Sequence, residues 1–126
     1  RSEPDPAAAY APAAADVVAA FAGVTGPDQP FVLPEFGTDT PFPAARAMGF
    51  HLLDYVVHAW DVAAALDLPF TPDADLVAAA LPIALAVPPT SPAFADPLPA
   101  GEGGGPLARV LTTLGREPRP QDLATA

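Results

Sequence analysis

The only two histidines of this 126-residue chain lie in one short apolar segment, FHLLDYVVHAWD, which spans residues 50–61. Two aspartates, Asp54 and Asp61, lie in the same segment. On a helix of 3.6 residues per turn, His51, Asp54 and His58 fall within an arc of about 60°. The spacing therefore predicts a row of imidazoles and carboxylates along one side of a helix.

Asp54 and His58 form the pair best suited to bind a metal ion together. They are four residues apart, so on a helix their side chains are neighbours separated by one turn. Zinc, nickel and iron accept imidazole nitrogen and carboxylate oxygen, with bond lengths of about 2.0–2.2 Å in zinc sites. A carboxylate that is buried without a partner is costly, and a metal ion would supply the partner. Because one helix does not easily complete a coordination shell, we expect a further protein ligand from another helix.

Three other residues are candidates for the same site. His51 lies about 10 Å from His58 along the helix axis, so we expect it to donate a hydrogen bond to a metal ligand, to act as an alternative ligand, or to face a loop. Asp61 is expected to accept a hydrogen bond from His58 and orient its ring, or to cap nearby backbone groups. Arg46 is either a solvent-facing residue or a contact for an anionic substrate. A simpler interpretation has no metal, and in it Asp54 and His58 form a hydrogen bond that is purely structural.

The row belongs to the longest segment without a helix breaker, a predicted helix at about 43–66. Its apolar residues point in nearly every direction, which is typical of a helix that is buried on all sides. Alanine content, capping residues and terminal glycines predict three more helices, at about 6–22, 73–87 and 106–114. Phe31, Val32 and Leu33 can form only a short strand-like connection between two prolines. The tail from Arg116 onward is expected to be frayed.

These elements predict an all-α fold in a single domain or partial domain, with the helices packed as an antiparallel bundle. The net charge of −10, from five arginines, no lysine and fifteen carboxylates, argues against nucleic acids and anionic membranes as partners. No apolar run approaches the roughly 20 residues that cross a bilayer, and we expect a cytoplasmic location. Only 16% of the residues are charged, so part of the apolar surface is expected to face a partner. The chain has no cysteine, so any thiol chemistry would need an external thiol.

The segment HLLDYVVHAWDVAAALDLPF resembles the metal-binding helix of the DinB-like, mycothiol-dependent maleylpyruvate isomerase superfamily, which reads roughly D-x-x-V-H-x-W-D-x-A. The preceding residues and the tail FADPLPAGEGGGPLARVLTTLGREP are also similar, so the resemblance spans about residues 5–118. It implies a four-helix bundle of which this chain is the C-terminal half. The first two helices of the family, which carry one histidine ligand, are absent here. Asp54 and His58 would take the places of the acidic and histidine ligands of the family, although several relatives have glutamate at the first position.

The resemblance also implies a function. It points to a divalent metal, zinc first and nickel or iron as alternatives, and to a low-molecular-weight thiol such as mycothiol as co-substrate. The metal would lower the pKa of the thiol, and the thiolate would add to a small-molecule electrophile in an isomerisation or an S-transfer. We expect the missing histidine to come from an N-terminal half or a partner chain, so the polypeptide is a fragment, a processed product or a separate subunit, and a homo-oligomer is a further alternative. The competing function is a non-catalytic metal-binding or structural subunit that pairs through an exposed apolar face.

Overall fold

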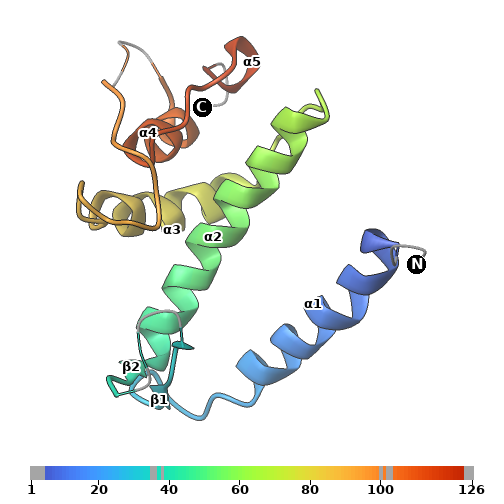
Figure 1. The fold of residues 1–126 in the computed structure, drawn as a ribbon, viewed down its shortest axis with the longest axis vertical. Coiled ribbons are helices and arrows are strands. Elements are labelled where there is room, and N and C mark those ends of the chain that lie inside the picture. Colours follow the sequence, from blue (N-terminus) through green and yellow to red (C-terminus); the bar gives the residue numbers. More distant parts are fainter. Residues whose placement is uncertain (1–4, 35–36, 38, 100, 102–103, 124–126) are drawn as a thin grey trace. The chain divides into compact units, whose positions relative to one another are not determined.

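The computed structural model describes residues 5–34, 37, 39–99, 101 and 104–123. Within these ranges the chain is mostly helical, with five helices and one pair of very short strands (Figure 1). The predicted all-α class is therefore confirmed. The chain divides into two compact units, Arg1–Met48 and Gly49–Ala126, and each is described by itself. None of the helices in the described ranges is long and apolar enough to cross a membrane.

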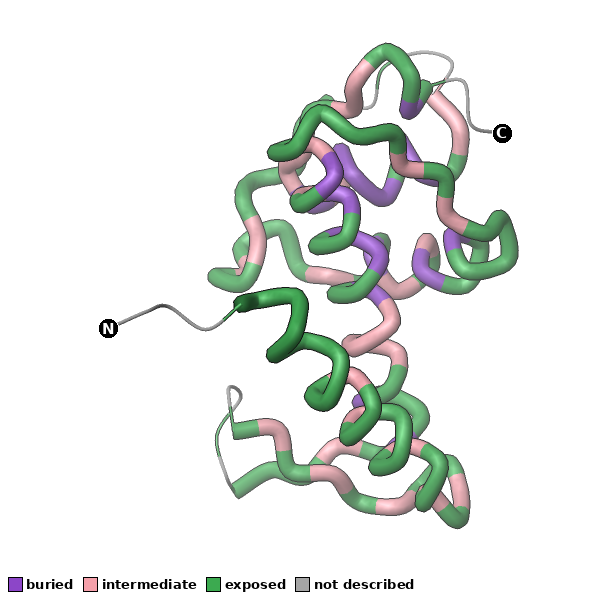
Figure 2. Tube along the Cα trace, turned by 90° about the vertical axis from the view of Figure 1, so that its right-hand side faces the viewer, coloured by how far each residue is buried: buried purple, intermediate pink, exposed green. Residues whose placement is uncertain are grey.

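The first unit begins with α1 (Pro6–Ala22). The side chain of Asp5 accepts a hydrogen bond of 3.0 Å from the backbone N–H of Ala7, and Pro6 occupies the first helical position, where its missing N–H is not needed. None of the residues of α1 is buried (Figure 2). The ring of Phe21, near its end, lies 6.1 Å from that of Phe31.

A two-stranded antiparallel ribbon follows, made of β1 (Pro30–Phe31) and β2 (Phe42–Pro43), with Phe31 opposite Phe42. The strand-like connection predicted at Phe31, Val32 and Leu33 is confirmed only at Phe31, because Val32 and Leu33 lie outside the strand. The segment just before β1 also caps the start of the long helix. The backbone N–H groups of Ala44 and Ala45 donate to the carbonyls of Gln29 and Pro27, at 2.8 and 2.9 Å. The first N–H groups of a helix have no partner within the helix, so the carbonyls of Pro27 and Gln29 take the place of a side-chain cap.

The long helix is α2 (Ala44–Ala65), close to the predicted range of 43–66. Two residues after its last residue, Asp67 has a left-handed backbone with φ of 53°. The N–H of Leu68 donates to the carbonyl of Ala63 at 2.8 Å, and the N–H of Asp67 donates to that of Ala64 at 3.2 Å. This is a Schellman motif, which satisfies the last carbonyls of the helix.

The second unit contains most of α2 together with α3 (Ala74–Leu85), α4 (Pro106–Thr113) and the short α5 (Pro120–Leu123). Asp73 caps α3 by accepting a hydrogen bond of 2.9 Å from the N–H of Asp75. Helix α3 packs against α4. Together with one side of α2 they bury a single apolar cluster, whose members include Leu53, Val56, Val57, Trp60, Val77, Leu107, Val110, Leu111 and Leu114.

Two expectations from the sequence are wrong. Helix α2 is not buried on all sides, because Val62 and Leu66 are 59% and 63% exposed. The described part of the second unit covers one side of the helix and leaves these side chains outside the core. The tail from Arg116 is not frayed up to residue 123, because it makes side-chain bonds to α2 and forms α5. Residues 124–126 lie outside the described ranges.

Candidate functional site

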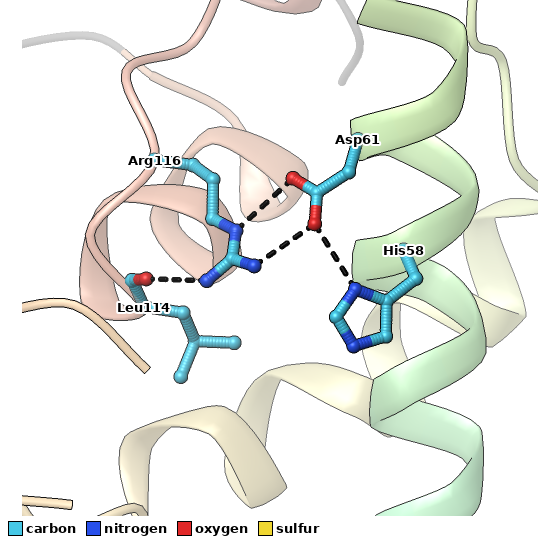
Figure 3. Close-up of polar contacts among 4 residues, drawn as sticks. All are labelled: His58, Asp61, Leu114 and Arg116. Atoms are coloured by element: carbon cyan, nitrogen blue, oxygen red, sulfur yellow. Dashed lines mark hydrogen bonds and ion pairs between the residues drawn. The ribbon is translucent and has the colours of Figure 1, made fainter. Parts of the chain in front are cut away.

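The carboxylate of Asp61 on α2 is the centre of a polar cluster (Figure 3). Arg116 holds it with two hydrogen bonds, from Nε to Oδ1 at 3.1 Å and from Nη2 to Oδ2 at 2.9 Å. His58 Nδ1 lies 3.0 Å from Asp61 Oδ2. The third guanidinium nitrogen, Nη1, donates to the carbonyl oxygen of Leu114 at 2.8 Å. The guanidinium is thus fixed on both sides, and through Asp61 it fixes the imidazole.

A turn at Gly115, after α4, places the side chain of Arg116 in this cluster. Gly115 has φ of +77°, which favours glycine, and the N–H of Arg116 reaches back to the carbonyl of Leu111 at 2.8 Å. A Cβ atom on Gly115 would lie 2.6 Å from the Cβ of Ala95 and 2.8 Å from the carbonyl oxygen of Asp96. The sequence Leu-Gly-Arg therefore ends the helix in a tight turn, and its third residue points at α2.

The charge of Asp61 determines which nitrogen of His58 carries a proton. Hydrogen bonds from Arg116 lower the pKa of Asp61; partial burial opposes this effect, and the bond to His58 adds to it. Asp61 is therefore a carboxylate at neutral pH and can only accept hydrogen bonds. His58 Nδ1 must then be the donor, so in a neutral imidazole the lone pair is on Nε2. Figure 3 shows Nε2 on the side of the ring facing away from Asp61, and the side chain of His58 is 60% exposed.

The other predicted site residues have different surroundings. Asp54 is exposed on α2, one turn before His58, and so it is not the buried carboxylate that the sequence suggested. The ring of His51 meets that of Tyr55 edge-on at 4.7 Å, and its Nε2 is shielded from solvent. Arg46 belongs to the first unit, where its guanidinium lies 5.5 Å from the ring centre of Phe42. The described ranges contain no group of three or more His, Asp or Glu side chains arranged to hold a metal ion.

A second polar network, which the sequence did not predict, joins α2 to the tail. Asp122 is fully buried, and its Oδ2 accepts hydrogen bonds from Trp60 Nε1 and from the backbone N–H of Arg119, both at 2.9 Å. The Arg119 guanidinium adds two bonds to the carboxylate, at 3.1 and 3.2 Å, and lies 5.5 Å over the Trp60 ring. Burial alone would raise the pKa of Asp122, but these hydrogen bonds outweigh it and lower the pKa.

The sequence contains only a weak local signal for this network, and its longest-range hydrogen bond leaves no signal in the sequence. Asp122 is the third residue after Arg119, with Pro120 between them, an arrangement common at the first turn of a helix. Its bond to Trp60, however, joins residues that are 62 positions apart. No local pattern in the sequence contains that pairing.

The second unit also has a cleft of about 500 Å³ beside α4. Its lining is mainly apolar, with Arg109 and Glu117 as its charged members. The hydroxyl of Thr112, also in the lining, already donates to the carbonyl of Ala108 at 3.0 Å. A cleft of this size could admit a small amphiphilic molecule.

Comparison with protein families, with curated proteins and with solved structures gives no match to this chain. The case for a function therefore comes from the residues described above. Among them, the imidazole of His58 is the group best prepared for chemistry, because one of its nitrogens is held by a carboxylate and the other faces outward.

Proposed function

We propose that this chain supplies Asp54 and His58 to a divalent-metal site of a thiol-dependent isomerase or S-transferase. The observation that carries the proposal is the hydrogen bond of 3.0 Å between His58 Nδ1 and Asp61, whose carboxylate is held in turn by Arg116. Histidines that bind metals almost always donate their other ring N–H to a carboxylate, a carbonyl or a water. The bond fixes the tautomer and the ring orientation, and it makes the outward nitrogen a better ligand.

Asp54 and His58 provide half of a coordination shell. Both side chains are exposed, and their spacing of four residues puts them one turn apart on α2. Zinc sites need at least one more protein ligand, which would come from outside the described residues, in an N-terminal half or a partner chain. In a four-helix bundle of the DinB-like type, that N-terminal half or partner chain would complete the bundle and would contribute a histidine as the further ligand. The same nitrogen and oxygen donors suit nickel and iron.

The metal would lower the pKa of a small thiol, so that the thiol is deprotonated at neutral pH. A bound divalent cation lowers the pKa of a coordinated thiol, and the resulting thiolate is the nucleophile. The chain has no cysteine, so the thiol would be an external co-substrate such as mycothiol, which adds to a small electrophile. In this scheme Asp54 and His58 bind the metal, and Asp61 is a positioning residue that acts through His58.

One observation favours a second, non-catalytic function. The side chain of His58 is 60% exposed. Catalytic metals usually lie in a cavity that limits the access of water. An open site of this kind suits a subunit in which the metal joins two chains without turnover.

Zinc titration calorimetry of the whole chain together with its partner half, in a buffer that does not bind metal, tests the ligands. We expect His58→Ala and Asp54→Ala each to abolish stoichiometric zinc binding, because either change removes one of the two donors that this chain supplies. Asp61→Asn should weaken zinc binding by about 10–100-fold while both donors remain. Asp16→Ala, which removes an exposed helical carboxylate from α1, is the matched control and should leave binding unchanged.

Equal zinc affinity of the wild type, His58→Ala and Asp54→Ala would refute the metal site. Far-UV circular dichroism of each variant shows whether α2 remains folded. Turnover of a thiol with an electrophile, measured on the protein together with its partner half and with zinc bound, separates the two functions. No thiol-dependent turnover in that assembly would favour the non-catalytic subunit.

A further inference from the structure

Helix α2 presents two exposed metal donors, and they fill only half of a coordination shell. Asp61 lies three residues after His58 and holds its Nδ1 at 3.0 Å, whereas Asp54 lies four residues before His58. Figure 3 shows Nε2 on the opposite side of the imidazole, toward the earlier turns of α2. None of the ion pairs among the described residues involves Asp54. One ion can therefore contact Nε2 of His58 and the carboxylate of Asp54 together.

The described part of the chain supplies no third donor to this pair. It contains no group of three or more His, Asp or Glu side chains arranged to hold a metal ion. The other histidine, His51, has its Nε2 shielded from solvent and its ring against that of Tyr55. Structural zinc sites are almost always tetrahedral, with four protein ligands. The two missing ligands of such a site would therefore come from another polypeptide.

A second copy of the chain supplies two ligands of the right kind. Most soluble homo-oligomers are closed assemblies, two-fold dimers above all, in which the same surface of each copy faces the other. A two-fold axis that passes through the ion would bring the Asp54 and His58 of both copies to it. The resulting two carboxylates and two imidazoles form a shell of four donors that zinc accepts.

The charge of the chain makes such a dimer dependent on the ion. Each copy carries a net charge of −10, so two copies repel one another. At the site itself, the two charges of a zinc ion balance the two Asp54 carboxylates, because the imidazoles bind as neutral ligands. The dimer should therefore form only when the metal is bound.

We propose that a zinc ion joins two copies of this chain on a two-fold axis, with Asp54 and His58 of each copy as its ligands. The inference rests on the metal ligands of the proposed function, and it names the partner chain of the non-catalytic form. A shell closed by four protein ligands is typical of structural zinc, whereas catalytic zinc keeps one position open. The test accordingly measures assembly rather than turnover.

Sedimentation velocity of the full chain alone, with zinc as the only added metal, measures the assembly. We expect a monomer in EDTA and a species of twice the mass once half an equivalent of zinc is present, and excess EDTA should reverse the change. Zinc titration calorimetry of the same chain should show one ion per two chains. In ¹⁵N NMR spectra, zinc should shift the Nε2 resonance of His58 and leave the resonances of His51 in place.

Variants identify the ligands of the bridging ion. His58→Ala and Asp54→Ala should each abolish the zinc-dependent dimer at micromolar protein, because each leaves only one donor per copy. Asp54→His keeps a donor at this position, so it should retain the dimer. His51→Gln is the matched imidazole control and Asp16→Ala, on α1, is the carboxylate control, and both should dimerise like the wild type. Far-UV circular dichroism verifies that each variant is folded.

The dimer would be overturned by a zinc-saturated chain that stays monomeric, by a dimer that persists in EDTA, or by a zinc-dependent dimer that His58→Ala leaves intact. Zinc that binds one ion to one chain through Asp54 and His58, or that binds only after an N-terminal half is added, would refute the dimer and leave the metal ligands of the proposed function standing. Zinc affinity that neither His58→Ala nor Asp54→Ala changes would refute both.

Discussion

The buried carboxylate of Asp122 gives the sharpest test of what stabilises the second unit. Its two oxygens accept four hydrogen bonds, from Trp60 Nε1 and from three nitrogens of Arg119. Asp122→Ala would leave the Trp60 N–H and two of the three guanidinium nitrogens of Arg119, Nε and Nη2, without an acceptor, while Nη1 keeps its bond of 2.9 Å to the carbonyl of Leu68. Removing one partner of a buried ion pair costs about 3–5 kcal/mol of unfolding free energy. We expect Asp122→Ala to lose an amount in this range.

Asp122→Asn separates charge from shape. Three of the four bonds end on Oδ2, and one ends on Oδ1. An asparagine carbonyl in the place of Oδ2 retains the bond to Trp60 and two of those to Arg119, while its amide group faces the donor at Nη2. The variant loses one hydrogen bond and the ionic attraction, so a loss of about 1–3 kcal/mol is expected.

Acid should remove the same stabilisation from the wild type. The pKa values of Asp122 and Asp61 are lowered in the folded chain. Folding is therefore favoured by both carboxylates above their unfolded pKa of about 3.9, and this contribution is lost as the pH falls through the lower folded values. The difference in unfolding free energy between the wild type and Asp122→Asn should shrink steadily below about pH 4.

Urea denaturation, followed by Trp60 fluorescence and by far-UV circular dichroism, measures these changes. Trp60 is the only tryptophan, and Asp122 bonds directly to its indole N–H, so its emission reports on this network. Asp16→Asn, which changes an exposed carboxylate on α1, is the control and should alter stability by less than about 0.5 kcal/mol. A loss below about 1 kcal/mol for Asp122→Ala, or a wild-type advantage over Asp122→Asn that is the same at pH 7 and pH 3, would refute the reasoning.

Two further predictions concern the left-handed turns. Gly115→Ala should lose about 2–4 kcal/mol in urea denaturation, because the new Cβ meets Ala95 at 2.6 Å and φ is +77°; a change within 0.5 kcal/mol would contradict the turn geometry. Asp67→Gly should gain about 0.5–1 kcal/mol, since φ there is 53° and a carboxylate at a helix C-terminus is unfavourable. A lower midpoint for Asp67→Gly would show that its attraction to Arg119 outweighs the relief of strain.

The helices could be predicted from the sequence because their signals are local. Asp5 with Pro6, Asp73 before α3, and Pro106 at the start of α4 each mark a helix start within two or three residues. The contact of His58 with Asp61 is one of the two alternatives that the sequence offers for Asp61, since it joins residues one turn apart on one helix. Such contacts follow from helical geometry alone.

The rest of the site could not be predicted, because it depends on how distant segments pack. Arg116 reaches Asp61 across 55 positions, and it does so only because the Gly115 turn points it toward α2. The tail has no apolar periodicity, so its stabilising ion pairs leave no trace in the pattern of hydrophobic residues. The apolar pattern of α2 does not distinguish a residue of the core, such as Val57, from an exposed one, such as Val62.

The two arginine–carboxylate networks differ in burial, although they join the same tail to adjacent residues of α2. Asp122 is fully buried, and a buried pair strongly penalises the loss of one partner. The Asp61 side chain is one-third exposed and that of Arg116 is 18% exposed, so solvent partly screens this pair, and we expect it to contribute less to stability than the buried one. Two guanidinium bonds to Asp61 and a third bond from the guanidinium to the Leu114 carbonyl hold the Asp61 carboxylate in one orientation. In the proposed function, this orientation positions the imidazole of His58, whose Nδ1 lies 3.0 Å from the carboxylate.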